Sequence, residues 1–276
     1  MPLLTLSTDI GQTDYLTGAI KGQLVSAIPA VNIVDITHHL SPQNYLQAAY
    51  ICNSAFRYFP QETFHIILIN LFETSPEYLL LAEHNHQYIA CPDNGILTMI
   101  AAAKPSNVIA VEVNRSNGLG VLQCTAALTD AFKKISNGKS LSSIGNTIVN
   151  IREKYPLRSS ISTNWIDSQI IFIDNFENVV VNITRDEFEE YSRGRKFKII
   201  FLRDEIIEEL SENYASVNAS EKLAWFNSAG YLEIAINKGN MAGLFGLQGY
   251  SENIAENAAM QNKLVYQTVR IFFEGE

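Results

Sequence analysis

Apolar and polar positions along the first half of the chain follow two different periods, and the two periods alternate. Short apolar runs rich in β-branched residues predict strands at residues 3–8, 31–37, 63–70, 78–83, 87–91 and 108–113. Apolar positions at helical spacing predict helices at residues 13–28, 45–59, 96–103 and 126–136. Thr13 is the expected N-cap of the first helix. This order, with strands that are apolar on both faces, predicts an α/β domain whose mostly parallel sheet is flanked by helices.

The second half of the chain is richer in strands. A stretch rich in serine at residues 157–164 indicates a linker, so we expect one domain over residues 1–157 and another over residues 165–276. Beyond the linker, apolar runs predict short strands at residues 169–173, 179–183, 196–202, 231–236 and 268–274. Thr184 and Glu187 form a capping box that opens a helix over residues 186–192. Short strands around one helix predict a small antiparallel sandwich or barrel.

Composition and charge exclude several classes of partner. Of the 276 residues, 47% are hydrophobic and 18% are charged, which is typical of a globular protein. The net charge is −9 and the chain has no basic block, so we expect no nucleic-acid and no acidic-membrane partner. No apolar run reaches the roughly 18 residues of a membrane span, and no signal peptide is visible. We therefore expect a cytoplasmic protein.

The cysteines and histidines do not predict a metal site. Cys52, Cys91 and Cys124 are widely spaced and form no Cys-x-x-Cys motif, so reduced thiols are expected. No group of His, Cys and Asp has the spacing of metal ligands, and we expect no metal and no cofactor. The motifs GxGxxG, GxxxxGK[ST], HExxH and GxSxG are also absent from the sequence.

Candidate chemistry in the first half lies where the predicted strands end, because ligands of open parallel sheets bind beyond the carboxyl ends of the strands. Asp9 follows the first strand and could accept hydrogen bonds from a ribose diol, or could serve as a loop or cap residue. His38 follows the second strand and is either a base or ligand, or a capping or exposed histidine. Asn94 lies in an Asp-Asn-Gly tripeptide that also fits an ordinary turn.

The second half carries two further polar turns. Asp174, Phe176 and Asn178 lie within one turn, where a carboxylate could hold an ammonium group and a ring could stack on a ligand. Asn227 and Ser228 precede the strand at residues 231–236 and could offer polar groups to a base edge. Both segments also fit hairpin turns without any function.

Taken in order, these motifs resemble one known family, the S-adenosylmethionine (SAM) hydroxide adenosyltransferases, which include SAM hydrolases and are related to the fluorinating and chlorinating enzymes. The matching residues are Ser-Thr-Asp-Ile-Gly at 7–11 with Lys21 and Gly22, Val-Asp-Ile-Thr-His at 34–38, Pro-Asp-Asn-Gly at 92–95, Asp174, Phe176, Asn178 and Asn182, and residues 227–235 with Gly239 and Asn240. The resemblance spans nearly the whole chain and implies an α/β domain followed by a smaller β-barrel domain.

The resemblance also implies a ligand, an assembly and a reaction. The resemblance implies a homotrimer in which SAM lies between one subunit's N-terminal domain and its neighbour's C-terminal domain. Asp9 would bind the ribose hydroxyls, and Asp174 would hold the methionine amino group beside Phe176 and Asn178. Asn227 and Ser228 would line the adenine site. In the family reaction, water or halide attacks C5′ of the ribose and expels methionine.

The chain departs from the family at the groups that activate water. The family hydrolases carry an Asp, an Arg and a His, and the corresponding positions are occupied by Asn70, Glu77 and Gln123. Neither Asn nor Gln can accept a proton at neutral pH, and loss of a general base costs roughly 10²–10⁴-fold in rate. The fluorinating enzymes have a small dry halide pocket instead. Phe72 and Glu73 do not fit such a pocket, because a nearby carboxylate would repel halide.

Three functions follow from this uneven match. The favoured one is a SAM- or adenosine-binding member of the family in which hydrolysis is weak or lost. The second is an active SAM hydrolase that uses Glu73 or Glu77 as a substitute base. The third is a structural trimer that binds no ligand.

Overall fold

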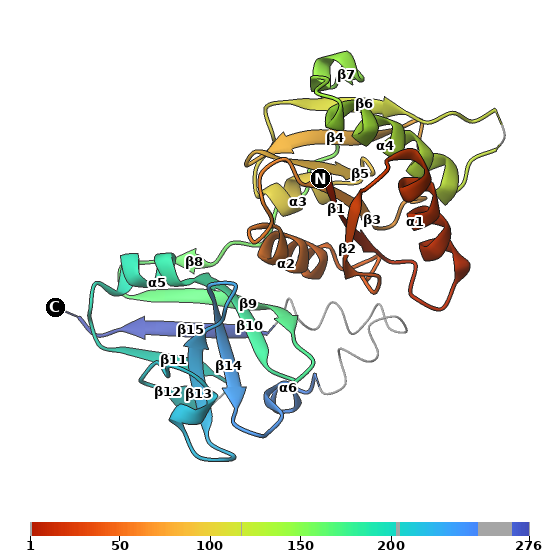
Figure 1. The fold of residues 1–276 in the computed structure, drawn as a ribbon. Helices are drawn as coiled ribbons and strands as arrows, with labels where there is room; N and C mark the ends of the chain where they lie inside the picture. Colours follow the sequence, from red (N-terminus) through yellow and green to blue (C-terminus); the bar gives the residue numbers. More distant parts are fainter. Residues whose placement is uncertain (1, 117, 203–204, 248–266, 276) are drawn as a thin grey trace. The chain divides into compact units, whose positions relative to one another are not determined.

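The chain divides into two compact units. The structure is a computed structural model that describes residues 2–116, 118–202, 205–247 and 267–275 (Figure 1). Contacts group Met1–Pro156 into the N-terminal unit and Leu157–Glu276 into the C-terminal unit.

The N-terminal unit is built on one twisted sheet. Its described strands are β1 (Leu3–Thr8), β2 (Asn32–Thr37), β3 (Phe64–Leu68), β4 (Tyr78–His84), β5 (Gln87–Cys91), β6 (Val108–Glu112) and β7 (Asn146–Thr147), in the spatial order β2-β1-β3-β5-β4-β6-β7. Pairs β1–β2, β1–β3 and β3–β5 are parallel. Pairs β4–β5, β4–β6 and β6–β7 are antiparallel. The predicted parallel strands are therefore confirmed for one half of the sheet, and a hairpin extends the other half.

Helices cover both faces of this sheet, as predicted (Figure 1). They are α1 (Tyr15–Ala27), α2 (Tyr45–Phe56), α3 (Ile96–Ala101) and α4 (Val121–Ser136), and Leu141–Ser143 forms a short 3₁₀ turn. Helices α1 and α4 share one apolar core with Phe64 and Ile66 of β3, whereas α2 and α3 share another with Ile67. Successive side chains of β3 thus point to opposite faces, which is why this strand reads as one continuous apolar run.

Two helix starts differ from the prediction. Asp14 occupies the N-cap position of α1, so the assignment of that position to Thr13 is wrong. Helix α4 begins at Val121, five residues before the predicted start, and Cys124 and Thr125 near its start are buried. Gln123 and Thr125 interrupt the apolar positions of these first residues, and the periodic pattern therefore predicted only the later part of the helix.

The C-terminal unit is a nearly closed antiparallel barrel, in agreement with the predicted fold class. Its described strands are β8 (Ser160–Ile161), β9 (Trp165–Ile173), β10 (Val179–Thr184), β11 (Phe197–Phe201), β12 (Glu205–Ile207), β13 (Lys222–Phe226), β14 (Tyr231–Ile236) and β15 (Thr268–Phe273). The order is β12-β11-β15-β9-β10-β14-β13, with β8 beside β9. An ion pair between Lys222 and Glu205 joins the two end strands.

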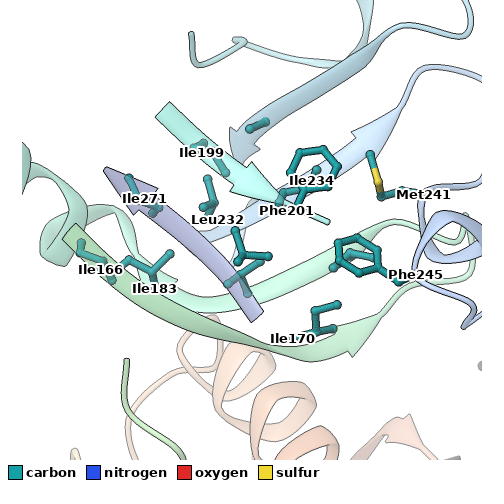
Figure 2. Close-up of a cluster of buried hydrophobic side chains, with 14 of the residues drawn as sticks. Ile166, Ile170, Ile183, Ile199, Phe201, Leu232, Ile234, Met241, Phe245 and Ile271 are labelled. Atoms are coloured by element: carbon teal, nitrogen blue, oxygen red, sulfur yellow. The ribbon is translucent and has the colours of Figure 1, made fainter. Parts of the chain in front are cut away.

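One apolar core fills this barrel. Ile170, Ile199, Leu232 and Ile271 come from four different strands and meet inside it (Figure 2). The predicted capping box is confirmed at the start of α5 (Arg185–Ser192). A short helix, α6 (Met241–Leu244), was not predicted, and neither were β12 and β13. These elements are only three to five residues long, which is too short for a periodic pattern.

Candidate functional site

Asp9 lies just beyond the carboxyl end of β1. Its backbone N–H donates to Leu68 O at 3.1 Å, and its carboxylate Oδ2 accepts from Asn70 N at 2.7 Å. Burial raises the pKa of Asp9, and the hydrogen bond from Asn70 opposes that shift. The carboxylate is therefore oriented by the end of the neighbouring strand β3, while the residue stays partly exposed to solvent.

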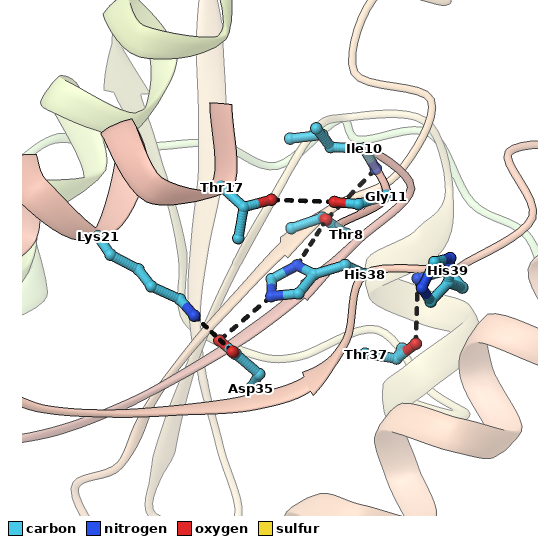
Figure 3. Close-up of polar contacts among 9 residues, drawn as sticks. All are labelled: Thr8, Ile10, Gly11, Thr17, Lys21, Asp35, Thr37, His38 and His39. Atoms are coloured by element: carbon cyan, nitrogen blue, oxygen red, sulfur yellow. Dashed lines mark hydrogen bonds and ion pairs between the residues drawn. The ribbon is translucent and has the colours of Figure 1, made fainter. Parts of the chain in front are cut away.

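A buried histidine holds the turn that carries Asp9 (Figure 3). His38 is 1% exposed, and its Nδ1 lies 3.0 Å from Thr8 Oγ1. Its Nε2 lies 3.2 Å from an oxygen of Asp35, which also pairs with Lys21. If the Nε2 proton faces the Asp35 carboxylate, Nδ1 accepts from the Thr8 hydroxyl, and that oxygen can accept from Ile10 N at 3.3 Å. His38 is thus a packed and bonded residue, and the expectation of a capping or exposed histidine is wrong.

The segment after β3 contains a second polar chain. Asn70 has a left-handed backbone with φ of 47°, and its Nδ2 donates to the Tyr45 hydroxyl at 3.3 Å. That hydroxyl donates in turn to Glu73 Oε2 at 3.3 Å. Burial raises the pKa of Tyr45 to about 12, so the phenol stays protonated at neutral pH. The ammonium of Lys154 lies 3.8 Å from the centre of the Tyr45 ring.

Asn94 is a buried link between β3 and α3. Its Nδ2 donates to Ile69 O at 2.9 Å, and its Oδ1 accepts from Ile96 N at 3.2 Å at the start of the helix. The neighbouring Gly95 has φ of 96°, a backbone conformation that favours glycine. These bonds favour a structural role for Asn94 at the edge of the site.

A small cleft gathers part of the predicted site. It is lined by residues 70, 71, 73–78, 92–94 and 152, so it brings together Asn70, Glu77 and Asn94. Gln123 does not line this cleft. It lines a separate hollow together with Asn114, which lies between β6 and α4. The two places are connected by Arg115, whose Nη2 donates to Ser75 O at 3.3 Å.

In the C-terminal unit, Asp174 organises the turn between β9 and β10. Its Oδ1 accepts from the backbone N–H of Phe176 at 2.9 Å and of Asn178 at 2.8 Å. Its Oδ2 accepts from Asn178 Nδ2 at 3.0 Å. Oδ1 already accepts two bonds, but Oδ2 accepts only one and can accept another, so the same side chain can hold the turn and receive an amine. The Phe176 side chain is 77% exposed, an unusual position for a large ring.

Asn227 organises the turn between β13 and β14 in a similar way. Its Oδ1 accepts from the backbone N–H of Ala229 at 3.0 Å and of Tyr231 at 3.2 Å. Its Nδ2 donates to Glu233 Oε2 at 3.2 Å. Ser228 lies exposed at the tip of this turn. Both C-terminal motifs are thus turns whose polar side chains are fixed by their own backbone.

The described residues contain no group of three or more His, Cys, Asp or Glu side chains that could hold a metal ion. Over the same residues, no helix is both long enough and apolar enough to cross a membrane. Cys52, Cys91 and Cys124 are buried free thiols.

Sequence reasoning missed several polar residues that bond to these motifs, among them Tyr45, Arg115 and Glu233. It also missed Tyr214, whose hydroxyl accepts from Asn178 Nδ2 at 3.2 Å. One signal was available for Glu233, because it is a charged residue inside the apolar strand at 231–236. Tyr45 and Tyr214 lie far from their partners in the sequence, and only the fold brings them together.

An open α/β sheet with polar groups at its carboxyl edge, followed by an antiparallel barrel, defines a two-unit architecture. Comparison with known families identifies it. The model of the SAM hydroxide adenosyltransferase N-terminal domain matches residues 4–145, and that of the C-terminal domain matches residues 168–252. The chain belongs to the SAM hydroxide adenosyltransferase family.

Relatives at low identity include two kinds of enzyme. The chain is 24% identical over 196 residues to the (R)-S-adenosyl-L-methionine hydrolase of Methanocaldococcus jannaschii, which covers 68% of this chain and 69% of that protein. It is 24% identical over 254 residues to the hydrolase of the same name from Salinispora tropica, covering 89% and 94% of the two chains. It is 23% identical to a fluorinase of an Actinoplanes species over 90% of this chain and 95% of that one.

The fold is also found in a solved structure. An uncharacterized conserved protein from Thermotoga maritima superimposes with a TM-score of 0.76 at 22% sequence identity. The match covers 98% of this chain and 99% of the other. This likeness establishes the shared fold alone.

Proposed function

We propose that this chain binds SAM or adenosine and that its hydrolase activity is weak or lost. The observation that supports this is the pairing of Asp9 with residue 70. The Asp9 carboxylate is held by the backbone N–H of Asn70, whereas the side chain at that position is an amide and not a carboxylate. The group that would bind ribose is therefore present, and the group that would take the proton from water is not.

In this proposal the ligand contacts the N-terminal unit of one subunit and the C-terminal unit of its neighbour. In this proposal Asp9 binds the ribose hydroxyls, with the Asn94 turn beside it. Asp174, with Phe176 and Asn178, receives the methionine portion, and Asn227 with Ser228 lines the adenine site. The proposal includes a homotrimer with ligand between subunits and a cytoplasmic location, where free thiols such as those of this chain persist.

The chemistry explains why such a protein would bind without turning over. The sulfonium of SAM is a positively charged leaving group, so its departure needs little acid catalysis. Attack by water at C5′ needs a water held in line, stripped of its neighbours and relieved of a proton. Asn70 and Gln123 cannot accept that proton, and Glu77 brings a negative charge where the family resemblance expects a positive one.

Two measurements on the purified full-length chain test this proposal. Calorimetric titration with SAM and with adenosine is expected to show binding, which Asp9→Ala weakens by roughly tenfold or more. Chromatography of SAM incubations is expected to show no steady formation of adenosine and methionine. Turnover that Asp9→Ala abolishes would establish an active hydrolase instead. Absence of any binding would favour the third function, a structural trimer that binds no ligand.

One observation favours the active enzyme as the second candidate. Glu73 lies in the same cleft as Asn70 and is joined to it through the Tyr45 hydroxyl. A carboxylate in that place could take a proton from a water at the cleft. If it does, Glu73→Gln removes residual turnover while Glu77→Gln, a change of another carboxylate of the cleft, retains it. If turnover is unaffected by both changes, neither carboxylate is the base.

A further inference from the structure

The C-terminal unit buries one carboxylate that no step above uses. Glu233 is 4% exposed and lies in the middle of β14. Its carboxylate accepts hydrogen bonds from the Tyr214 hydroxyl, from Trp225 Nε1 at 3.0 Å and from Asn227 Nδ2 at 3.2 Å. Burial of a carboxylate is costly unless several donors satisfy it, and three converge here. Three donors on one buried carboxylate indicate an ordered hydrogen-bonded cluster.

The cluster extends to the other polar turn through Tyr214. The Tyr214 hydroxyl donates to Glu233 and accepts from Asn178 Nδ2 at 3.2 Å. Asn178 Nδ2 also bonds Asp174, so one chain of hydrogen bonds joins the turn at 174–178 to Asn227. Burial and the Glu233 carboxylate raise the pKa of Tyr214, which keeps its hydroxyl a donor.

We infer that Tyr214 and Glu233 are positioning residues that couple the turn at 174–178 to the turn at 227–230. The inference deepens the proposed function and rests on it. The first turn was assigned to the methionine end of the ligand and the second to the adenine end. A single cluster that fixes both turns makes the protein select a ligand that has both ends. SAM is such a ligand, and adenosine lacks the amino acid portion.

The cluster provides its own matched control. Tyr214 and Trp225 both donate to Glu233 Oε1, and their rings meet edge to face at 5.0 Å. Only Tyr214 also contacts the turn at 174–178 through Asn178. Tyr214→Phe therefore cuts the coupling, and Trp225→Phe removes a bond to the same oxygen without cutting it. Both changes keep an aromatic ring in place.

The binding experiment compares two ligands on the full-length protein. Dissociation constants for SAM and for adenosine are measured by calorimetry for the wild type, Tyr214→Phe and Trp225→Phe. Tyr214→Phe is expected to weaken SAM binding by roughly fivefold to tenfold, the worth of about one hydrogen bond, with little change for adenosine. Trp225→Phe should leave the ratio of the two constants unchanged. Equal ratios in all three proteins would overturn the inference.

A second measurement needs no ligand and separates this inference from the proposed function. Hydrogen exchange is followed at the Phe176 and Asn178 amides, whose N–H groups donate to Asp174. Tyr214→Phe is expected to speed exchange at both amides, and Trp225→Phe is not. Unchanged exchange in Tyr214→Phe would show that the turns are not coupled, whatever the wild type binds. Coupled exchange in a protein that binds neither ligand would refute the proposed function alone.

Discussion

Two segments leave the carboxyl edge of the same sheet, and they are built in different ways. The turn at residues 8–11 follows β1 and is tied down by side chains and backbone. Gly11 N donates to His38 O at 2.7 Å, and Thr8 O accepts from Leu40 N at 3.0 Å. The segment at residues 70–77 follows β3 and exposes most of its side chains, with Phe72 48% exposed.

The two segments differ in whether they suit ligand binding or the activation of water. A carboxylate that is to bind a ribose diol needs a fixed orientation. The buried His38 cluster holds the turn that carries Asp9, and the backbone N–H of Asn70 orients the Asp9 carboxylate. A carboxylate that activates water needs a dry and closed surrounding, because bulk water competes for the proton and hydrates the nucleophile. Glu73 and Glu77 lie on the exposed segment. The edge is thus better suited to binding a nucleoside than to reacting with it, which agrees with the proposed function.

The largest effect is expected from a substitution that restores a base to the exposed segment. Asn70→Asp places a carboxylate where the family hydrolases carry one, next to the Tyr45 hydroxyl that now accepts from Asn70. Because a positioned base typically contributes roughly 10²–10⁴-fold, SAM turnover is expected to rise by about a hundredfold or more. Chromatographic detection of adenosine and methionine measures it.

The other replaced position gives the control for that change. Gln123→His alters a residue in the separate hollow and is expected to add no turnover by itself. If Asn70→Asp is as inactive as the wild type, a missing base is not what limits this chain. The exposure of the whole segment would then be the stronger cause.

A smaller effect is expected from the cluster that holds Asp9. His38→Asn can still present an acceptor to Thr8 but cannot reach Asp35, whereas His38→Gln can reach Asp35 and loses the bond to Thr8. If the bond to Thr8 sets the turn, His38→Gln weakens adenosine binding by about tenfold and His38→Asn by less, as expected for an unpaired buried group. Equal losses in the two variants would show that His38 acts through packing alone. Calorimetric titration gives both constants.

The sequence predicts the fold better than it predicts the site, for a physical reason. Apolar periodicity is local, so β1, β5 and β14 are confirmed at the predicted residues. The end of a buried strand also indicates where ligands lie, which is how Asp9 was selected. The start of α4 carries a weaker signal, because Gln123 and Thr125 interrupt its apolar positions, and it was placed five residues late.

Contacts between distant residues account for what sequence reasoning missed. His38 is buried, with Nδ1 bonded to Thr8 and Nε2 3.2 Å from an oxygen of Asp35, and no local pattern distinguishes that from an exposed histidine. Glu233 shows the same limit, since its donors lie 6, 8 and 19 residues away along the chain. Polar clusters are assembled by the fold, so their members become visible only when the strands are paired.

The smallest expected effect is a gain in stability at the cost of binding. Burial raises the pKa of Asp9 above 3.8, its ordinary value, so the folded state holds this proton more tightly than the unfolded state. The wild type therefore loses stability as the pH rises from about 3.8 through the raised pKa. Asp9→Asn keeps an acceptor for Asn70 N and carries no charge. It should unfold at a higher temperature than the wild type at pH 7, by the equivalent of about 0.5 kcal/mol, the size usual for a partly exposed site.

This gain has a clear signature in thermal unfolding. The difference between Asp9→Asn and the wild type should shrink as the pH is lowered toward 4, because the wild-type carboxyl then takes up its proton. Asp93→Asn is the control, since Asp93 accepts from Arg152 N at 2.7 Å and from the Tyr78 hydroxyl at 3.0 Å. A loss of stability in Asp9→Asn at pH 7 would show that the N–H groups around Asp9 more than offset its burial. The Asp9 turn would then be as favourable for folding as it is for binding, and no conflict between the two would exist at this edge of the sheet.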